Sequence, residues 1–244
     1  MNLILLDAAE LCEDGTARLQ GRRAAHVLEV LRPAIGGKLQ VGVVGGRLGS
    51  AEVAALGERE VVLRVALDRE PPPRAPVDLL LAMPRPKILR KVLHAAASMG
   101  IARVVLLGSY RVEKSYFATP LLAPAALDAE LRLGLEQGRD TVPPEVTTRR
   151  FFKPFVEDEL DGTFPGAQRL LAEPSARRRL EEVAPSATRA VVAIGPEGGW
   201  TRYEADELMR RGFASFTVGP RVLRVDAAVP YIVGQLELWL RAHV

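Results

Sequence analysis

Two glycine-containing segments near the C-terminus have the residue types of ligand-binding loops. The first reads IGPEGGW at 194–200 and the second reads VGPRVLRVDAA at 218–228. Each follows a short apolar run typical of a buried parallel strand, and each precedes a segment with helical periodicity. Such loops bring bare backbone to a ligand in the crevice at the carboxyl ends of parallel strands. The sequence therefore predicts a small-molecule site at these two loops.

Other residue types and missing motifs exclude several kinds of cofactor or metal site. One cysteine, Cys12, and three scattered histidines (His26, His94 and His243) argue against a zinc centre, so no metal is expected. The first strand expected after residue 76 runs into MPRPK at 83–87 rather than into a G-x-G-x-x-G turn, and no G-x-x-x-x-G-K-[ST] occurs. Rossmann dinucleotide sites and P-loops are therefore disfavoured.

Alternating strand and helix patterns after residue 76 must position the two loops. Apolar runs predict strands at 77–82, 103–107, 169–172, 190–194 and 215–218. Helical periodicity predicts helices at 86–99, 120–137, 175–183, 202–211 and 227–240. This alternation is typical of an α/β fold, in which helices cover both faces of a parallel sheet.

A proline segment, EPPPRAP at 70–76, divides the chain into two predicted domains. Consecutive prolines favour a stiff, extended spacer that neither a helix nor a central strand tolerates. Residues 1–70 have mainly β patterns, which favours a small β-barrel with a binding role, and residues 71–244 hold the α/β domain. The strands expected in the first domain are 3–6, 38–44, 47–55 and 60–67, and its one helix is 21–31.

Composition and charge indicate a soluble, cytoplasmic protein that could meet nucleic acid. Of 244 residues, 48% are hydrophobic and 26% charged, and the net charge is +3. Between Leu79 and Val112 there is no acidic residue, whereas six basic residues fall there. This excess favours contact with a phosphate backbone, although a solvated helix face would show the same charges. The single cysteine suits a reducing compartment, and neither a membrane span nor a signal peptide is expected.

Further motifs accompany the two glycine segments: LLAEPS at 170–175, LEQGRDTVPPEV at 135–146 and GRRAAHVLEVLRPAIGGKL at 21–39. With them, the chain resembles the RsmE family of 16S rRNA uridine-N3 methyltransferases, in the SPOUT superfamily of trefoil-knotted enzymes. The resemblance implies a SPOUT α/β knot methyltransferase domain that follows a PUA-like, RNA-binding β-barrel. It also implies a homodimer paired through the C-terminal domain, and 16S rRNA or the small ribosomal subunit as the partner.

The same resemblance implies S-adenosylmethionine as the cofactor, held in a pocket of three loops. By motif, the adenine would lie against the second glycine segment and the ribose and methionine portion against the first, with 171–173 as the third wall. Glycines allow this close approach, and backbone polar groups can read an adenine edge. The residues assigned to the cofactor are Leu171, Ala172, Glu173, Ile194, Gly195, Pro196, Gly198, Gly199, Val218, Gly219, Val222, Leu223, Arg224 and Ala227.

The resemblance assigns catalysis to Arg224 and Asp226. Arg224 would stabilise charge that develops on the uracil carbonyls. Asp226 would orient Arg224 or accept the proton from N3. The family usually shows Glu-Thr where this chain has Asp226 and Ala227. This departure keeps open a same-fold methyltransferase for another RNA position, and a non-catalytic RNA-binding factor of ribosome assembly is a further alternative.

Basic and amide side chains in both domains are expected to contact RNA. They would position phosphates, whereas base identity would come from the pocket. An ordinary solvated side chain is the alternative for each of them. The residues assigned to RNA are Arg22, Arg23, His26, Arg32, Arg85, Lys87, Arg111, Lys114, Gln137 and Arg139.

Apolar residues at helical spacing in the last predicted helix indicate a dimer. Most of them would pack in the core, and so rich a stripe near the cofactor favours pairing of two such helices about a two-fold axis. These residues are Val229, Ile232, Val233, Leu236, Trp239 and Leu240.

Overall fold

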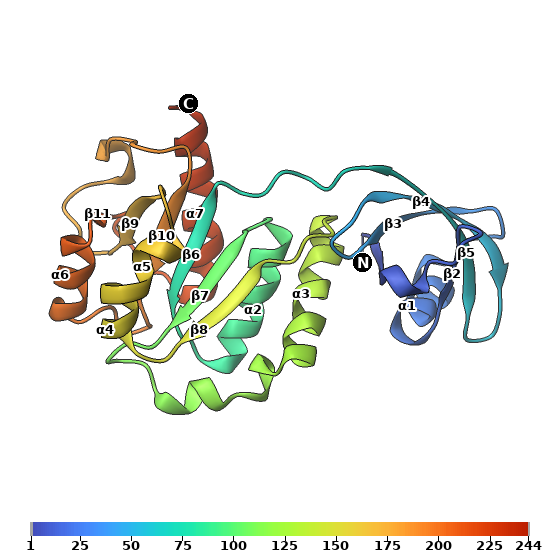
Figure 1. Cartoon of the computed structure of the whole chain (residues 1–244), viewed down its shortest axis with the longest axis horizontal. Helices are drawn as coiled ribbons and strands as arrows, with labels where there is room; N and C mark the ends of the chain where they lie inside the picture. Colours follow the sequence, from blue (N-terminus) through green and yellow to red (C-terminus); the bar gives the residue numbers. More distant parts are fainter. Residues whose placement is uncertain (1, 244) are drawn as a thin grey trace.

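A six-stranded parallel sheet forms the centre of the larger part of the chain in the computed structural model, which describes residues 2–243 (Figure 1). The strand order is β11-β9-β10-β6-β7-β8, and every neighbouring pair is parallel. Parallel neighbours need crossover connections, so helices are expected on both faces. The strands are β6 (Val77–Ala82), β7 (Arg103–Leu107), β8 (Glu145–Arg149), β9 (Gln168–Ala172), β10 (Ala190–Ile194) and β11 (Ala214–Phe216).

The apolar runs of the sequence form the predicted strands. β6, β7 and β10 have the predicted bounds, and every residue of β6 and β10 is buried. β11 ends before Thr217 because this residue leaves the ladder, and its hydroxyl donates to the Gly219 carbonyl at 3.0 Å. β8 is not predicted, because its EVTTR sequence is polar and it lies half-exposed at the edge of the sheet.

Helices cover both faces of the sheet, as the alternation predicts. They are α2 (Pro86–Ser98), α3 (Pro124–Gly138), α4 (Phe152–Pro154), the π-helix η5 (Phe155–Glu159), α5 (Leu160–Thr163), α6 (Arg202–Arg210) and α7 (Val225–Arg241). Leu79 and Leu81 of β6 pack with α2, α3 and α7, whereas Leu80 and Ala82 pack with α4, η5, α5 and α6. Successive strand side chains point to opposite faces, which gives the sheet two separate cores.

The predicted helix at 175–183 is wrong. Only a 3-10 turn forms there, η6 (Leu180–Glu182). The chain runs instead beside the end of β11, where the Thr217 N–H donates to the Arg178 carbonyl at 2.9 Å. Tertiary backbone pairing thus overrides the local helix preference. Residues 152–163, for which no element is predicted, form α4, η5 and α5.

The N-terminal part forms a second sheet, of five strands in the order β1-β3-β4-β5-β2. The β1–β3 pair is parallel and the other pairs are antiparallel. The predicted helix is present as α1 (Gly21–His26), continued by the π-helix η2 (Val27–Leu31). The predicted strands are present too, and β2 is an additional one. The strands are β1 (Ile4–Leu6), β2 (Thr16–Leu19), β3 (Lys38–Val43), β4 (Leu48–Leu56) and β5 (Val61–Arg69).

An extended segment at 70–76 joins the two sheets (Figure 1). The chain at β1 packs into both cores. Ile4 and Leu6 lie in the core of the small sheet. Leu3 and Leu5, which alternate with them, belong to the core of the large sheet on the α3 side. The two parts of the chain therefore share an apolar interface despite the stiff connection.

Arg22 and Glu136 form an ion pair across this interface, and Glu136 is 3% exposed. The Arg22 guanidinium donates to both carboxylate oxygens, at 2.6 and 3.0 Å. We expect Arg22→Met to lower the free energy of unfolding by about 1–3 kcal/mol, because a buried carboxylate loses its partner. Urea unfolding followed by circular dichroism measures this loss. The double variant Arg22→Met/Glu136→Gln should recover most of the lost free energy of unfolding. An unchanged urea midpoint in Arg22→Met would refute the stabilising role of the ion pair.

Candidate functional site

The two glycine segments meet at the carboxyl edge of the large sheet and form one pocket. It lies where β9, β10 and β11 end, and its empty space, counted to the open mouth, is about 740 Å³. A pocket of this kind at the ends of parallel strands can hold a small organic molecule. The predicted cofactor residues that line it are Ala172, Glu173, Ile194, Gly195, Pro196, Gly199, Val218, Gly219, Val222 and Leu223.

The remaining predicted cofactor residues lie beside the pocket rather than in its wall. Leu171 is buried in the core on the opposite face of the sheet, because it alternates with Ala172 along β9. Gly198 lines a neighbouring hollow. Arg224 and Ala227, at the start of α7, are not part of the lining.

Helix α7 supplies a wall of the pocket that the sequence prediction missed. Val225, Ala228 and Ile232 line it. They stand at positions i, i+3 and i+7, so the helical periodicity of this segment already indicates that they share one face. Phe216, the last residue of β11, and Trp200 add aromatic surface. The pocket thus combines apolar walls with loops that offer backbone polar groups.

Two glycines shape these loops in different ways. A Cβ on Gly195 would stand 3.1 Å from indole atoms of Trp200, so this glycine makes room for the tryptophan rather than for a ligand. Gly219 has a φ of 149°, and no atom lies within 4 Å of where its Cβ would stand. Gly219 therefore leaves bare backbone facing open space, as the sequence predicts for a ligand loop.

Trp200 places an unsatisfied donor in the pocket wall. Its side chain is 6% exposed, and its Nε1 has no hydrogen-bond partner among the described residues. The indole packs on Phe152, with ring centroids 5.9 Å apart. Buried polar groups are nearly always hydrogen-bonded, so this N–H is an exception. Its nitrogen is covered by protein atoms and lies beside Gly195, so it does not open into the pocket.

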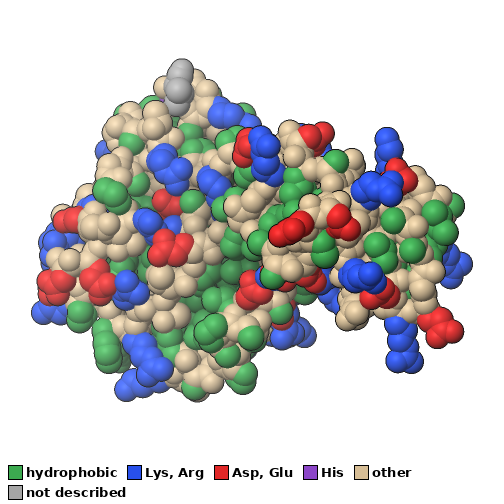
Figure 2. Space-filling model, turned by 45° about the vertical axis from the view of Figure 1, so that its right-hand side comes forward, with side chains coloured by type: hydrophobic (Ala, Val, Ile, Leu, Met, Phe, Trp, Pro, Cys, Tyr) green, Lys and Arg blue, Asp and Glu red, His purple; other side chains and the backbone are tan. Residues whose placement is uncertain are grey.

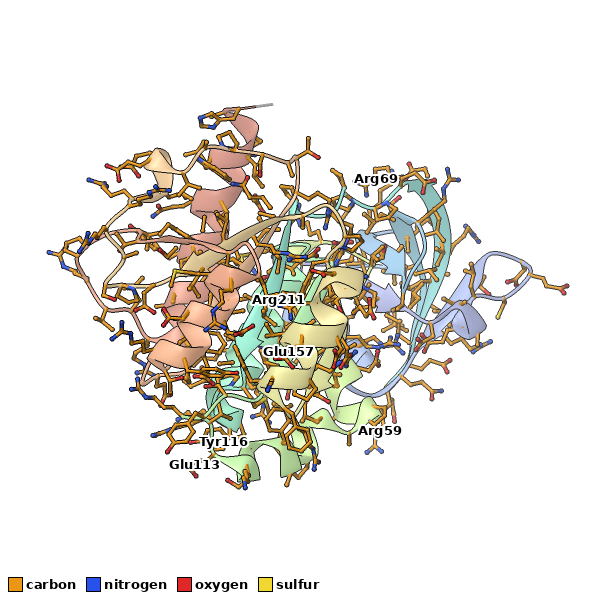
Figure 3. All side chains as sticks on the ribbon, turned by 60° about the vertical axis from the view of Figure 1, so that its left-hand side comes forward. Arg59, Arg69, Glu113, Tyr116, Glu157 and Arg211 are labelled. Carbon is orange, nitrogen blue, oxygen red and sulfur yellow. The ribbon has the colours of Figure 1, made fainter. Side chains whose placement is uncertain are left out.

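A second hollow lies on the other side of the first glycine segment. The Arg111 side chain donates to the Gly198 carbonyl, and Arg85 pairs with Glu197 at 3.1 Å. These two arginines fix the loop that separates the hollow from the pocket. Figure 3 shows Glu113 and Tyr116 close together at the edge of the molecule, and both line this hollow. Its other lining residues are Met83, Pro84 and Pro196.

Arg224 and Asp226 lie close to each other beside the pocket. The Arg224 side chain is 74% exposed, and its Nε lies 3.4 Å from Asp226 Oδ1. Lys91 of α2 donates to Asp226 Oδ2 at 2.7 Å. This hydrogen bond, helped by the charge of Arg224, holds the pKa of Asp226 below its ordinary value. A carboxylate with a lowered pKa is a weaker base, which favours the orienting role over that of proton acceptor.

The residues predicted to contact RNA divide into engaged and exposed side chains. Arg22 is paired with Glu136, and Arg23 with Glu10. The Nε2 of His26 is buried and without a hydrogen-bond partner among the described residues. Arg85 and Arg111 are exposed but bind the first glycine segment, and the exposed Arg32 donates to the Glu29 carbonyl at 2.7 Å. The other exposed residues are Lys87, Lys114, Gln137 and Arg139.

The basic side chains of α2 are accessible to solvent, but most of them form ion pairs. Arg90 and His94 both contact Glu130, at 2.7 and 2.6 Å, and Lys91 contacts Asp226. Figure 2 likewise shows Lys and Arg side chains interspersed with Asp and Glu over the face it presents. Contact with a polyanion would therefore depend on individual cations rather than on a broad basic field. Residues 2–243 contain no group of three or more His, Cys, Asp or Glu side chains that could hold a metal ion.

Asp226 predicts a pH-dependent contribution to stability. Because its pKa is lowered in the folded chain, the carboxylate stabilises the fold above its ordinary pKa of about 3.9, and this effect is lost as the pH falls towards the folded value. We expect Asp226→Asn to lower Tm equally at about pH 8 and about pH 5, and by less below about pH 4. Scanning calorimetry measures the difference. Asp206→Asn, whose carboxylate lies 3.7 Å from Arg202, is the matched control; a difference that does not change with pH would contradict the prediction.

Comparisons with known proteins place these features in context. The ribosomal RNA small subunit methyltransferase E of Treponema pallidum is 29% identical over 255 residues, which covers 99% of this chain and 94% of that protein. Ribosomal RNA small subunit methyltransferase E 1 of Borreliella burgdorferi is 22% identical, covering 93% of this chain and 94% of that protein. The crystal structure of the corresponding Neisseria gonorrhoeae enzyme, bound to S-adenosylmethionine, superposes with a TM-score of 0.75 at 19% identity and covers 98% of each chain.

The family itself follows from a match over more than half of the sequence. The model of the RNA methyltransferase domain matches residues 70–237, which include both glycine segments and the whole pocket. The resemblance to RsmE drawn from the motifs is confirmed by the named relatives, and the shared α/β fold by the superposition. The chain belongs to the RNA methyltransferase family.

Proposed function

We propose that this protein transfers a methyl group from S-adenosylmethionine to N3 of a uridine in small-subunit ribosomal RNA. The observation that carries the proposal is the pocket of glycine loops and apolar walls in a chain of the RNA methyltransferase family. The relatives named for small-subunit rRNA methylation and the neighbour with bound S-adenosylmethionine support the substrate and the cofactor.

The residues present fit S-adenosylmethionine. The apolar walls of Val225, Ala228 and Ile232 suit the adenine ring, and the loop at 218–223 offers backbone groups for its edge. When bound, the cofactor supplies an electrophilic methyl group on a sulfonium. The protein's own contribution is to orient both reactants and to keep water away.

The target base is assigned to the second hollow, which shares the first glycine segment with the cofactor pocket. Methylation at N3 requires loss of a weakly acidic proton, which leaves negative charge on the uracil carbonyls. The exposed Arg224 guanidinium can stabilise that charge, while Asp226 and Lys91 hold the start of α7 in place. Arg85 and Arg111 would contact the phosphates beside the base.

The finer architecture belongs to the proposal as well. A trefoil knot is supported by family membership and by the meeting of the β10 and β11 loops with α7 around one pocket. A PUA-like, RNA-binding barrel at 1–70 is supported by the five-stranded sheet and by the start of the family match at residue 70. A cytoplasmic location is supported by the role in rRNA methylation.

A homodimer through the C-terminal domain is also proposed, but through other residues of α7 than the sequence indicates. Val229, Ile232, Val233, Leu236, Trp239 and Leu240 are buried within the chain. The apolar side chains that α7 and the preceding loop leave exposed are instead Val222, Tyr231 and Leu238. These are the residues through which two copies would pair.

The decisive experiment maps methylated uridines in 16S rRNA from a deletion strain, before and after incubation of its small subunits with the purified protein and S-adenosylmethionine. The proposal predicts a missing N3-methyluridine that the protein restores. A modification restored at another kind of position would favour the same-fold alternative raised by Asp226 and Ala227. Absence of both cofactor binding and methyl transfer would favour a non-catalytic assembly factor.

Trp200→Phe tests the cofactor pocket. The variant keeps an aromatic ring against Phe152 but leaves a gap beside Gly195 in the pocket wall, so we expect S-adenosylmethionine to bind about 3–10-fold more weakly. Isothermal titration calorimetry measures the Kd. Trp239→Phe is the matched control, because Trp239 is equally buried and also has an unpartnered Nε1 but lies outside the pocket. Equal affinities of wild type and Trp200→Phe would show that the Trp200 indole does not shape the cofactor pocket.

Arg224→Ala tests the catalytic assignment. Because the side chain is exposed and does not line the pocket, cofactor affinity should stay near that of wild type. Loss of charge stabilisation should lower kcat for rRNA methylation by about 10²–10³-fold. Single-turnover methyl transfer to small subunits measures this, with Arg241→Ala at the other end of α7 as the control. Turnover within a few-fold of wild type would show that Arg224 has no catalytic role.

A further inference from the structure

A third hollow lies at the same carboxyl edge of the sheet, outside the cofactor pocket and the target-base hollow. It is built from the segments that follow β7 and β8 and from the first turn of α6, and its empty space is about 1090 Å³, counted to its wide mouth. Its rim carries Tyr110, Phe151 and Tyr203, whose exposed fractions are 87%, 72% and 51%. We call these three residues the aromatic rim.

Such exposure is unusual for rings of this size. Aromatic side chains gain most from burial, so three of them facing solvent around one hollow indicate a surface that another molecule covers. Tyr110, Phe151 and Tyr203 come from three separate segments of the chain. The fold, rather than any local sequence run, therefore brings them together.

The charges around the aromatic rim are positive where they are accessible. Arg150 is exposed and has no ion-pair partner among residues 2–243. Lys153 reaches a carboxylate only at 3.8 Å, from Glu157, which Figure 3 labels on η5. The Glu204 carboxylate in the wall is buried and already accepts from the Tyr110 N–H and from Thr201. A partner of negative charge thus fits this hollow.

The hollow also adjoins the proposed active site. Phe152 in its wall packs on Trp200, which lines the cofactor pocket. Tyr110 precedes Arg111, whose side chain binds the first glycine segment beside the target-base hollow. A chain that leaves the target-base hollow past Arg111 would therefore reach the aromatic rim next.

We propose that the aromatic rim stacks unpaired bases of the RNA that flank the target uridine, with Arg150 and Lys153 at their phosphates. Exposed aromatic faces beside cations are the means by which proteins hold single-stranded RNA without reading its sequence. This inference deepens the proposed function and rests on it for the identity of the RNA.

The test measures RNA affinity and methyl transfer for the double variant Phe151→Ala/Tyr203→Ala. Fluorescence anisotropy with a labelled single-stranded oligouridylate should show binding weaker by about tenfold or more, since each lost stack is worth a substantial part of that factor. KM for small subunits should rise, while the Kd for S-adenosylmethionine stays unchanged. The conservative variant Phe151→Tyr/Tyr203→Phe keeps both rings and should bind oligouridylate as wild type does.

Met209→Ala is the matched control, because Met209 is an exposed apolar residue of the same helix α6 outside the hollow. Unchanged oligouridylate affinity and KM in the double variant would overturn the inference while leaving the proposed methyl transfer intact. If oligouridylate binding depends on the aromatic rim but the protein methylates no rRNA, the inference about RNA stacking is supported and the proposed function is rejected. A change from dimer to monomer in the double variant, measured by sedimentation, would assign the rim to a protein contact instead and overturn the inference.

Discussion

Parallel pairing of β9, β10 and β11 is the constraint on which the site depends. Three strands that run in the same direction end at the same edge, so the loops that follow them must converge there. The backbone groups of these loops have left the sheet ladder and are available to a ligand. Helix α7 returns under the same edge and closes the pocket with Val225, Ala228 and Ile232. The site thus consists mainly of backbone and apolar surface, which suits a cofactor whose adenine and ribose need shape and hydrogen bonds more than charge.

Electrostatics around the pocket serve mainly to hold its parts in place. Arg111 and Arg85 bind the first glycine segment, and Lys91 ties α2 to the start of α7 through Asp226. Most cations of the basic stretch are therefore already committed to partners. Arg224 lies outside this stretch; its side chain is exposed and contacts Asp226 on one side. Exposed pairs of this kind contribute little to stability, so a catalytic use for Arg224 costs the fold little.

The small sheet is positioned by the same core that supports the site. Strand β1 and the residue before it are buried on both faces, with Ile4 and Leu6 in one core and Leu3 and Leu5 in the other. Arg22, expected at an RNA surface, instead binds the buried Glu136 of α3. An RNA bound by both parts would therefore meet a fixed surface rather than two tethered modules, which lowers the entropy lost on binding.

The sequence alone determined the buried strands, most helices and the two glycine loops, because long apolar runs and glycine-rich motifs constrain local backbone strongly. The family was indicated by the resemblance of its motifs. The sequence did not reveal β8, whose polar residues pair only because β7 lies beside them, and it wrongly predicted a helix at 175–183, where the end of β11 captures the backbone. Tertiary structure also decided which residues of the motifs face the pocket: Ala172 does and Leu171 does not, since a strand alternates its faces. The partners of Arg22, the unpartnered indole of Trp200 and the aromatic rim depend on segments far apart in the chain, and no local pattern specifies such contacts.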